Sequence, residues 1–152
     1  MQLKPNLSRR HVIGALALTG IQSTAADSAI TVGLIGCGDR GILVARLLKT
    51  NPNARLVALC DIFEDRIEKA KREIPVESPR IYKDFRKLLA SDVDAVIIAT
   101  PVFLHPEHFE GAVQAKKHIY IEKPAAVDVA GCKRVMRAAD LADRRLNIAF
   151  GL

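Results

Sequence analysis

The sequence of 152 residues contains no tryptophan, and aromatic residues make up only 5% of it. The net charge is +6, but no basic stripe interleaved with aromatic side chains, of the kind that grips nucleic acid, is present. Nucleic acid is therefore not an expected partner. We interpret the excess positive charge as a solvated surface.

Cysteine is also scarce. Cys37, Cys60 and Cys132 are far apart in the sequence, and no C-x-x-C pair occurs among them. This spacing does not fit the ligand pairs of zinc sites, so we predict no metal site. Cys60 falls in a predicted strand, where cysteine usually behaves as a small buried apolar residue.

The apolar stretch 12–21 is too short to span a bilayer as a helix. It follows Ser8-Arg9-Arg10 in a segment without acidic residues, and small residues suited to cleavage come after it at 23–26. Residues 8–13 resemble the twin-arginine export signal. We therefore expect an export signal at residues 1–26 and a periplasmic mature chain. The alternative is a basic leader with a chance apolar run, which would leave the protein in the cytoplasm.

Beyond the leader, short β-branched runs alternate with helical stretches, which predicts an α/β fold with a doubly wound parallel sheet. The uninterrupted apolar run 95–99 is typical of a strand covered on both faces. The last predicted helix has one apolar stripe, made of Val129, Cys132, Met136 and Ala139. The predicted strands are 30–35, 55–60, 80–82, 95–99, 118–121 and 146–150. The predicted helices are 42–49, 62–73, 84–90, 106–116 and 128–143.

A glycine loop joins the first predicted strand to the first helix. Gly36 fits a tight turn, Gly38 leaves the backbone bare for an approaching pyrophosphate, and Gly41 lets the helix pack closely. A phosphate would then lie on the free amides at the start of the helix. Asp61 ends the next strand twenty positions after Gly41, where a carboxylate bonds a ribose hydroxyl. The other loop residues of this predicted dinucleotide site are Cys37, Asp39 and Arg40.

Asp61 also indicates which dinucleotide is bound. A carboxylate at this position accepts hydrogen bonds from both ribose hydroxyls and repels a 2′-phosphate. Ile62 and Phe63 follow it, so no adjacent arginine welcomes such a phosphate. We therefore expect NAD in preference to NADP, with Arg40 as the one loop cation that could reach a phosphate.

Two further segments follow later strands at the same edge of the predicted sheet. Thr100 and Pro101 come after the fourth strand, where they could line the nicotinamide ribose. His105 either contacts the cofactor or caps the next helix. We expect His108 at the surface.

Lys123 follows the fifth strand, with Glu122 before it and Pro124 after it. A lysine at a strand end, beside an acid and a bound nicotinamide, can exchange protons with a substrate. The alternative is a solvated lysine that precedes a proline turn.

Residues 33–41, 99–101 and 115–124 together resemble the glucose–fructose oxidoreductase / inositol dehydrogenase family (Gfo/Idh/MocA), over roughly 29–152. The resemblance implies an NAD(P)-binding Rossmann domain at 27–152 of an oxidoreductase acting on sugars or polyols, homo-oligomeric at full length. It implies that Lys123 is the catalytic lysine, relaying a proton to or from a substrate hydroxyl, and that Glu122 contacts ribose or substrate. Thr100, Pro101 and His105 would contact the nicotinamide half of the cofactor.

The resemblance leaves alternatives open. Some exported members are NAD-dependent glycosidases, which oxidise, eliminate and re-reduce without net redox. Members are more than twice as long, and their C-terminal α/β domain supplies the substrate pocket. The sequence ends at Phe150-Gly151-Leu152, where the family enters that domain. We therefore expect the substrate domain to be absent and this chain alone not to turn over substrate. The third interpretation is a catalytically silent NAD-binding module or a truncated remnant.

Overall fold

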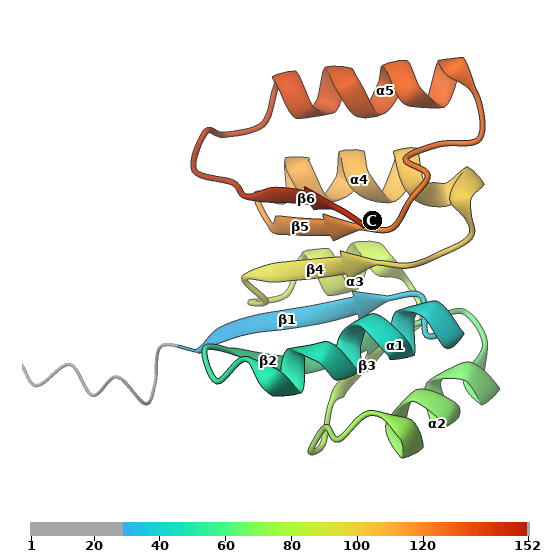
Figure 1. The fold of residues 1–152 in the computed structure, drawn as a ribbon, viewed down its shortest axis with the longest axis vertical. Helices are drawn as coiled ribbons and strands as arrows, with labels where there is room; N and C mark the ends of the chain where they lie inside the picture. The colour runs from blue at the N-terminus through green and yellow to red at the C-terminus, as the bar shows by residue number, and fades with distance from the viewer. Residues whose placement is uncertain (1–28, 152) are drawn as a thin grey trace, which may run out of the picture.

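The computed structural model describes residues 29–151, so the predicted export signal lies outside the described residues. Within them, six strands form one sheet in the order β3-β2-β1-β4-β5-β6 (Figure 1). All neighbouring strands are parallel. This confirms the doubly wound sheet, whose strand order reverses between β1 and β4. The strands are β1 (Ile30–Ile35), β2 (Ala54–Cys60), β3 (Arg80–Tyr82), β4 (Ala95–Ile98), β5 (His118–Ile121) and β6 (Ile148–Phe150).

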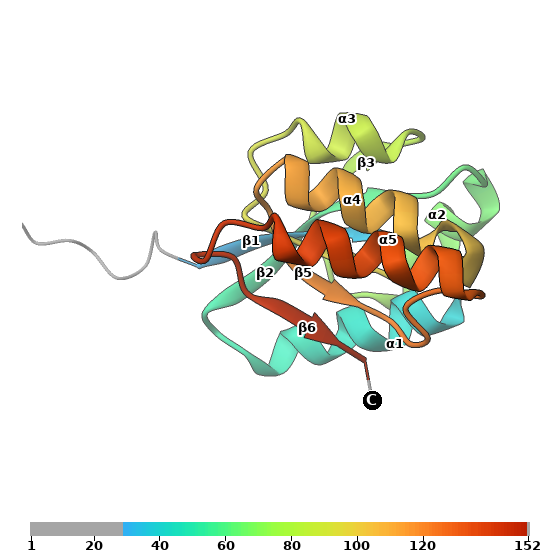
Figure 2. The ribbon, with the colours of Figure 1, turned by 90° about the horizontal axis from the view of Figure 1, so that it is seen from above.

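Helices cover both faces of the sheet. Figure 2 places α1 on one side of the sheet and α3 and α4 on the other. The α-helices are α1 (Asp39–Leu47), α2 (Glu64–Glu73), α3 (Phe85–Leu89), α4 (His105–Gln114) and α5 (Val129–Asp140). Two short 3₁₀ helices, η2 (Leu48–Thr50) and η3 (Val102–Leu104), extend α1 and precede α4.

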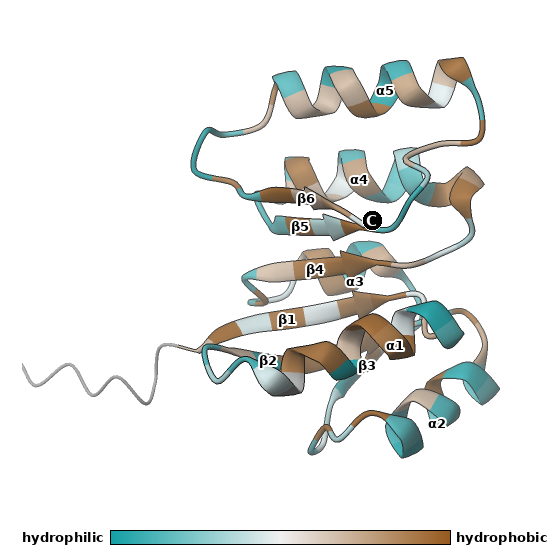
Figure 3. Ribbon diagram, viewed as in Figure 1, coloured by the Kyte–Doolittle hydropathy of each residue, from teal (hydrophilic) through white to brown (hydrophobic). Residues whose placement is uncertain are grey.

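The core lies on both faces because successive strand residues point to opposite sides. Leu34 packs with Ile67 of α2 on one face, whereas Ile35 belongs to the cluster around Phe109 of α4 on the other. A strand buried on both faces must be apolar at every position, as the run in β4 is. The central strands β1 and β4 are accordingly largely hydrophobic, and α2 is mostly hydrophilic (Figure 3).

The starts of α1 and α2, both near the site, differ from the sequence prediction. α1 begins at Asp39, three residues before the predicted start at residue 42. The predicted second helix begins at residue 62, but α2 begins at Glu64. The Asp61 carboxylate accepts a hydrogen bond from the Phe63 N–H at 3.0 Å, and Phe63 stays extended. A side chain that bonds the backbone two residues on competes with helix formation, which explains the delay.

The buried face of α5 also differs from the prediction. Val129 and Met136 of the predicted stripe are 71% and 65% exposed. The buried residues of α5 are Gly131, Val135 and Ala138. A Cβ at Gly131 would lie 2.7 Å from the Ala126 Cβ, so the helix approaches its neighbours closely at this glycine, and the stripe that continues from it through Val135 and Ala138 is the buried one.

No helix in residues 29–151 is both long enough and apolar enough to span a membrane.

Candidate active site

Two cavities lie at the carboxyl ends of the strands, where ligands bind in sheets of this kind. The first, of about 530 Å³, lies beyond β1, β2 and β4, and we call it the Asp61 cavity. The second, of about 450 Å³, lies beyond β4 and β5, and we call it the Lys123 cavity. Ala99 and Thr100 line both, so the two cavities adjoin. The Lys123 cavity is lined by Arg40, Ala99, Thr100, Val102, His105, Glu122 and Lys123.

Two glycines of the loop after β1 are required by the fold itself. Gly36 has a φ of +96°, and a Cβ there would lie 2.6 Å from the Ala99 carbonyl oxygen. A Cβ on Gly41 would lie 2.0 Å from the Gly36 carbonyl oxygen. Neither position has room for a side chain, as the fingerprint for a tight turn and close helix packing demands.

Gly38 is different, because nothing in the fold requires a glycine there. Its φ of −73° and ψ of 177° suit any residue. Within 4 Å, a Cβ would meet only Nη1 of Arg66, at 3.4 Å, which is an ordinary contact. The missing side chain therefore leaves an accessible stretch of backbone beside α1, as a closely approaching ligand would need.

The start of α1 adds the electrostatics of an anion site. Gly38 is the N-cap residue and has no side chain to accept a hydrogen bond from the first-turn amides. The positive end of the helix is therefore left uncapped at the loop. Phosphates bind at helix starts with this arrangement.

Asp61 is fixed at the end of β2 by the backbone. Its Oδ2 accepts a hydrogen bond from the Cys37 N–H at 2.8 Å, and its Oδ1 accepts one from Phe63 N–H. Two backbone donors thus orient a half-buried carboxylate that lines the Asp61 cavity. Cys37 contributes its amide to this arrangement, whereas its thiol faces the Cys60 carbonyl oxygen. Burial, with the nearby Asp61 charge, raises the pKa of the thiol to about 12.

The structure brings cations to the Asp61 cavity that the sequence interpretation missed. Arg66, Lys83 and Arg86 all line it. Lys83 pairs with Glu64, and Arg86 pairs with Glu107. The Arg66 guanidinium lies 5.3 Å from the centre of the Phe63 ring, and no carboxylate of residues 29–151 forms an ion pair with it.

The prediction that His108 lies at the surface is wrong. His108 is 5% exposed, and its ring centroid lies 4.2 Å from that of Phe85. Its Nδ1 is 3.0 Å from Oγ1 of Thr100, which it helps to place at the cavity wall. The helical spacing of the buried residues could have shown this, because they follow one stripe of α4. These residues are His105, Pro106, His108, Phe109, Ala112 and Val113.

The buried His108 gives the fold a specific pH dependence. Desolvation lowers the pKa of His108 from 6.5 to about 4. Above pH 6.5 the ring is neutral in both folded and unfolded chains, so it adds no pH dependence. Between pH 6.5 and pH 4 the unfolded chain takes up a proton that the folded chain refuses, so stability falls by up to about 3 kcal/mol as pH decreases.

We expect His108→Asn to remove the part of the acid-induced loss of stability that comes from His108. Denaturant unfolding of the wild type and the variant at pH 7.5, 5.5 and 4.5 measures it. The stability difference between the two proteins should shrink as the pH falls. A constant difference over that range would contradict the assigned titration.

His105 connects the loops after β4 and β5. It is the first residue of α4 and only 1% exposed. Its Nε2 lies 2.9 Å from the Thr100 carbonyl oxygen, and its Nδ1 lies 2.9 Å from the Pro124 carbonyl oxygen. Both ring nitrogens therefore contact backbone, one in the loop after β4 and the other in the residue that follows Lys123, and His105 and Lys123 line the same cavity.

Glu122 and Lys123 directly follow β5 and lie in contrasting environments. Lys123 is exposed, and its peptide bond to Pro124 is cis. Glu122 is 4% exposed and lies 2.9 Å from Nε of Arg40. Burial acts to raise the pKa of Glu122, but hydrogen bonds from Arg40 and Tyr120 outweigh it and hold the pKa below its ordinary value. Glu122 is therefore a carboxylate in this site.

The predicted site residues all lie in segments that follow β1, β2, β4 and β5, and their roles stay predictions. Those that line one of the two cavities are Gly36, Arg40, Asp61, Thr100, Pro101, His105, Glu122 and Lys123. Cys37, Gly38, Asp39 and Gly41 line neither cavity and belong to the loop after β1 and the start of α1. Pro101 lies in the wall of the Asp61 cavity, and Asp39 pairs with Lys69 of α2 at the start of α1. In the described part of the chain, no group of three or more histidine, cysteine, aspartate or glutamate side chains could hold a metal ion.

Comparison with known proteins supports this assignment of the fold. Residues 30–150 match the family GFO_IDH_MocA, described as "Oxidoreductase family, NAD-binding Rossmann fold". A scyllo-inositol dehydrogenase from Lactobacillus casei, solved with NAD(H) and scyllo-inositol, superposes with a TM-score of 0.72 at 27% identity. The superposition covers 81% of this chain and 36% of that one.

Curated relatives lead to the same family. Myo-inositol 2-dehydrogenase of Thermotoga maritima is 34% identical over 120 residues, which are 78% of this chain and 35% of the relative. A glycosyl hydrolase family 109 protein of Streptomyces niveus is 33% identical over 125 residues, or 77% of this chain and 25% of the relative. The chain thus spans about a third of the length of the inositol dehydrogenase it matches.

Proposed function

Because the chain belongs to the oxidoreductase family with an NAD-binding Rossmann fold, we propose that it is the cofactor-binding part of an NAD-dependent oxidoreductase of sugars or polyols. The observation that carries the proposal is Gly38. It is a glycine that neither the backbone conformation nor the packing requires, beside an uncapped helix start and a fixed carboxylate. A dinucleotide needs all three features together.

In this proposal the site residues divide between the two halves of the cofactor. Gly38, Asp39 and Gly41 would hold the pyrophosphate with backbone groups, and Arg40 adds a cation. Gly36 and Cys37, whose amides donate to Cys60 and Asp61, would form the turn that presents them. Asp61 accepts hydrogen bonds from the adenosine ribose. The nicotinamide half lies toward the Lys123 cavity, whose wall includes Thr100 and His105.

Bound NAD would supply the hydride acceptor, and the chain would supply the proton transfer. Lys123 is exposed at the end of β5, so its amine can approach a substrate hydroxyl. We propose that this amine takes the hydroxyl proton during oxidation and returns it during reduction. The substrate class follows from the relatives named as inositol dehydrogenases, since inositol is a polyol.

Asp61 is expected to make the chain prefer NADH to NADPH. A 2′-phosphate would meet its carboxylate, and repulsion of even 1.4 kcal/mol corresponds to about tenfold in affinity. Arg66 lines the same cavity and reduces the penalty, so NADPH binding is weakened rather than abolished. In fluorescence titrations, Asp61→Asn should reduce the preference for NADH, given as the affinity for NADH divided by that for NADPH, by about tenfold. Arg66→Gln should increase this preference. An unchanged preference in both variants would contradict the assignment.

A glycosidase is the second candidate function, favoured by the similarity to the glycosyl hydrolase family 109 protein. Assays of the whole protein on free polyols and on glycosides, with NAD added, separate the two. Reduction of NAD by a free polyol or sugar supports the oxidoreductase. Sugar release without net formation of NADH supports the glycosidase. Saturable NADH binding with neither activity would indicate a silent module.

We further propose that residues 1–26 export the folded protein to the periplasm. Support comes from the Arg9-Arg10 pair and the apolar stretch 12–21, both outside the described residues. Fusion of residues 1–26 to a reporter that is exported only when folded tests this. Replacement of both arginines by lysine should retain the reporter in the cytoplasm. Export that survives this change, or no export of the wild-type fusion, would contradict the signal.

A further inference from the structure

The Glu122 carboxylate is held in one orientation by its surroundings. The Tyr120 hydroxyl donates a hydrogen bond to Oε1 at 2.9 Å, and Nε of Arg40 lies 2.9 Å from the same oxygen. The other oxygen faces Gly151, where a Cβ would approach it to 2.7 Å. A buried carboxylate enclosed in this way has little freedom to turn toward a ligand.

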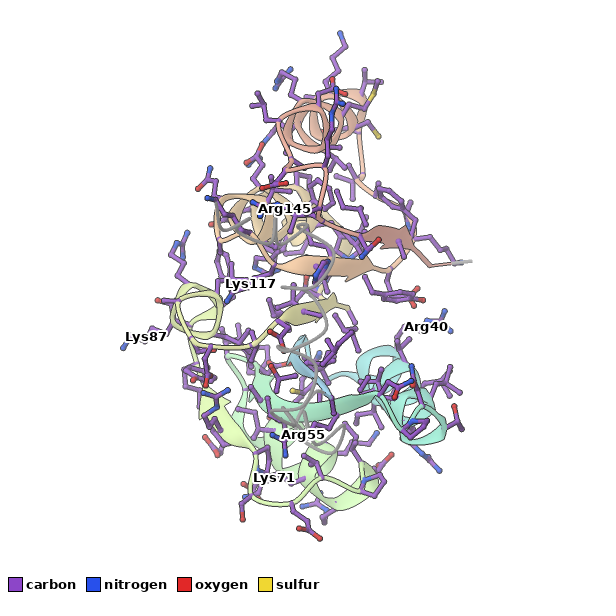
Figure 4. All side chains as sticks on the ribbon, turned by 90° about the vertical axis from the view of Figure 1, so that its left-hand side faces the viewer. Arg40, Arg55, Lys71, Lys87, Lys117 and Arg145 are labelled. Atoms are coloured by element: carbon purple, nitrogen blue, oxygen red, sulfur yellow. The ribbon has the colours of Figure 1, made fainter. Side chains whose placement is uncertain are left out.

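Without its ion pair to Glu122, the Arg40 side chain would be free to change rotamer. Its side chain is 48% exposed, and exposed arginines lose side-chain entropy when they are held in one geometry. Figure 4 shows it standing out from the ribbon on the side of the molecule where α1 lies. The charge on Glu122 fixes this side chain before any ligand arrives.

Arg40 also occupies a place where a phosphate contact is possible. It lies in the first turn of α1, two residues after Gly38, and it lines the Lys123 cavity. Its partner Glu122 precedes Lys123, so the ion pair joins the start of α1 to the end of β5. Pre-orienting a binding group reduces the entropy lost when a ligand binds.

We propose that Glu122 is a positioning residue, which orients Arg40 toward the phosphates of the cofactor and does not itself bind ribose or substrate. This inference rests on the proposed function, because it requires a dinucleotide at the glycine loop. If this is so, Glu122 affects the affinity for the cofactor only when Arg40 is present.

A double-mutant cycle tests the inference with NADH as the ligand. Arg40→Gln should weaken NADH binding about tenfold, as expected for loss of a charge-assisted contact. Glu122→Gln, which keeps the shape of the side chain, should weaken it by about threefold to tenfold. In the double variant, the loss should equal that of Arg40→Gln alone. Lys69→Gln is the control, since it removes an ion pair to the same helical turn outside the cavities, and it should change affinity less than about twofold.

A second ligand separates positioning from a general structural effect. Adenosine has no phosphate, so its affinity, measured from amide shifts in NMR spectra, should be the same for wild type and Glu122→Gln. Additive losses in the cycle, or equal losses for NADH and adenosine, would overturn the inference and leave the proposed function standing. Failure of the wild type to bind NADH would overturn both.

Discussion

Replacement of Gly38 by alanine should abolish measurable NADH binding and leave the thermal unfolding midpoint of the chain unchanged. The new Cβ would meet only the end of the Arg66 side chain at 3.4 Å, and the backbone at residue 38 suits alanine. The methyl group would instead occupy the space that an approaching pyrophosphate needs. We expect the affinity to fall by at least about a hundredfold, which corresponds to roughly 3 kcal/mol.

The experiment combines a fluorescence titration with a thermal melt of the same sample. Gly111→Ala is a suitable control, because Gly111 lies in the middle of α4 and itself lines neither site cavity. Its Cβ would meet Leu89 at 3.1 Å and the Phe85 ring at 3.2 Å. The control should retain NADH binding even where its stability changes. Unchanged affinity in Gly38→Ala would show that no ligand approaches the backbone there.

Unlike Gly38→Ala, replacement of Gly41 by alanine should act on stability, and should unfold or severely destabilise the chain. Its Cβ would lie 2.0 Å from the Gly36 carbonyl oxygen, which is backbone and cannot move aside without displacing the loop. A forced shift of the loop and helix together costs about 3 kcal/mol or more. Denaturant unfolding at pH 7.5 measures the loss directly.

Gly38→Ala and Gly41→Ala together distinguish a glycine that a ligand requires from a glycine that the fold requires. Gly36→Ala should resemble Gly41→Ala, because Gly36 combines a φ of +96° with a Cβ only 2.6 Å from the Ala99 oxygen. A Gly41→Ala variant as stable as the wild type would show that α1 and the loop do not pack as described.

Most of the sheet could be predicted from sequence because its strands are short apolar runs between clear breaks. Residues 30–35, 80–82 and 118–121 are strands as predicted. The helix predicted at 84–90 is confirmed as α3, and Asp84 caps it, since its side chain accepts a hydrogen bond from the Arg86 N–H. In each case a local signal of period or capping coincides with the tertiary structure.

The errors occurred where packing outweighed local pattern. In α5, Val129 and Met136 face outward because the close approach at Gly131 buries the stripe that also holds Val135 and Ala138. In α4 we expected His108 at the surface, yet it packs against Phe85, which lies far away in the sequence.

The candidate site was predictable in its backbone motifs and less so in its charges. The glycine loop and Asp61 follow a fixed spacing, which a single sequence displays. The pairing of Arg40 with Glu122 and the position of Arg66 in the Asp61 cavity depend on how α1, α2 and β5 converge. No local pattern encodes those contacts.

The central claim is that NAD binds at the loop after β1, with its adenosine half in the Asp61 cavity. Titration of NADH into the isotopically labelled chain, followed residue by residue in amide NMR spectra, tests it most directly. We predict saturable shifts with one stoichiometric site, concentrated at residues 36–41, at Asp61 and at Thr100. Absence of saturable shifts would contradict the account. So would shifts confined to the separate cavity between α3 and α4, which is lined by Phe85, Leu89, Glu107 and Gly111 among others.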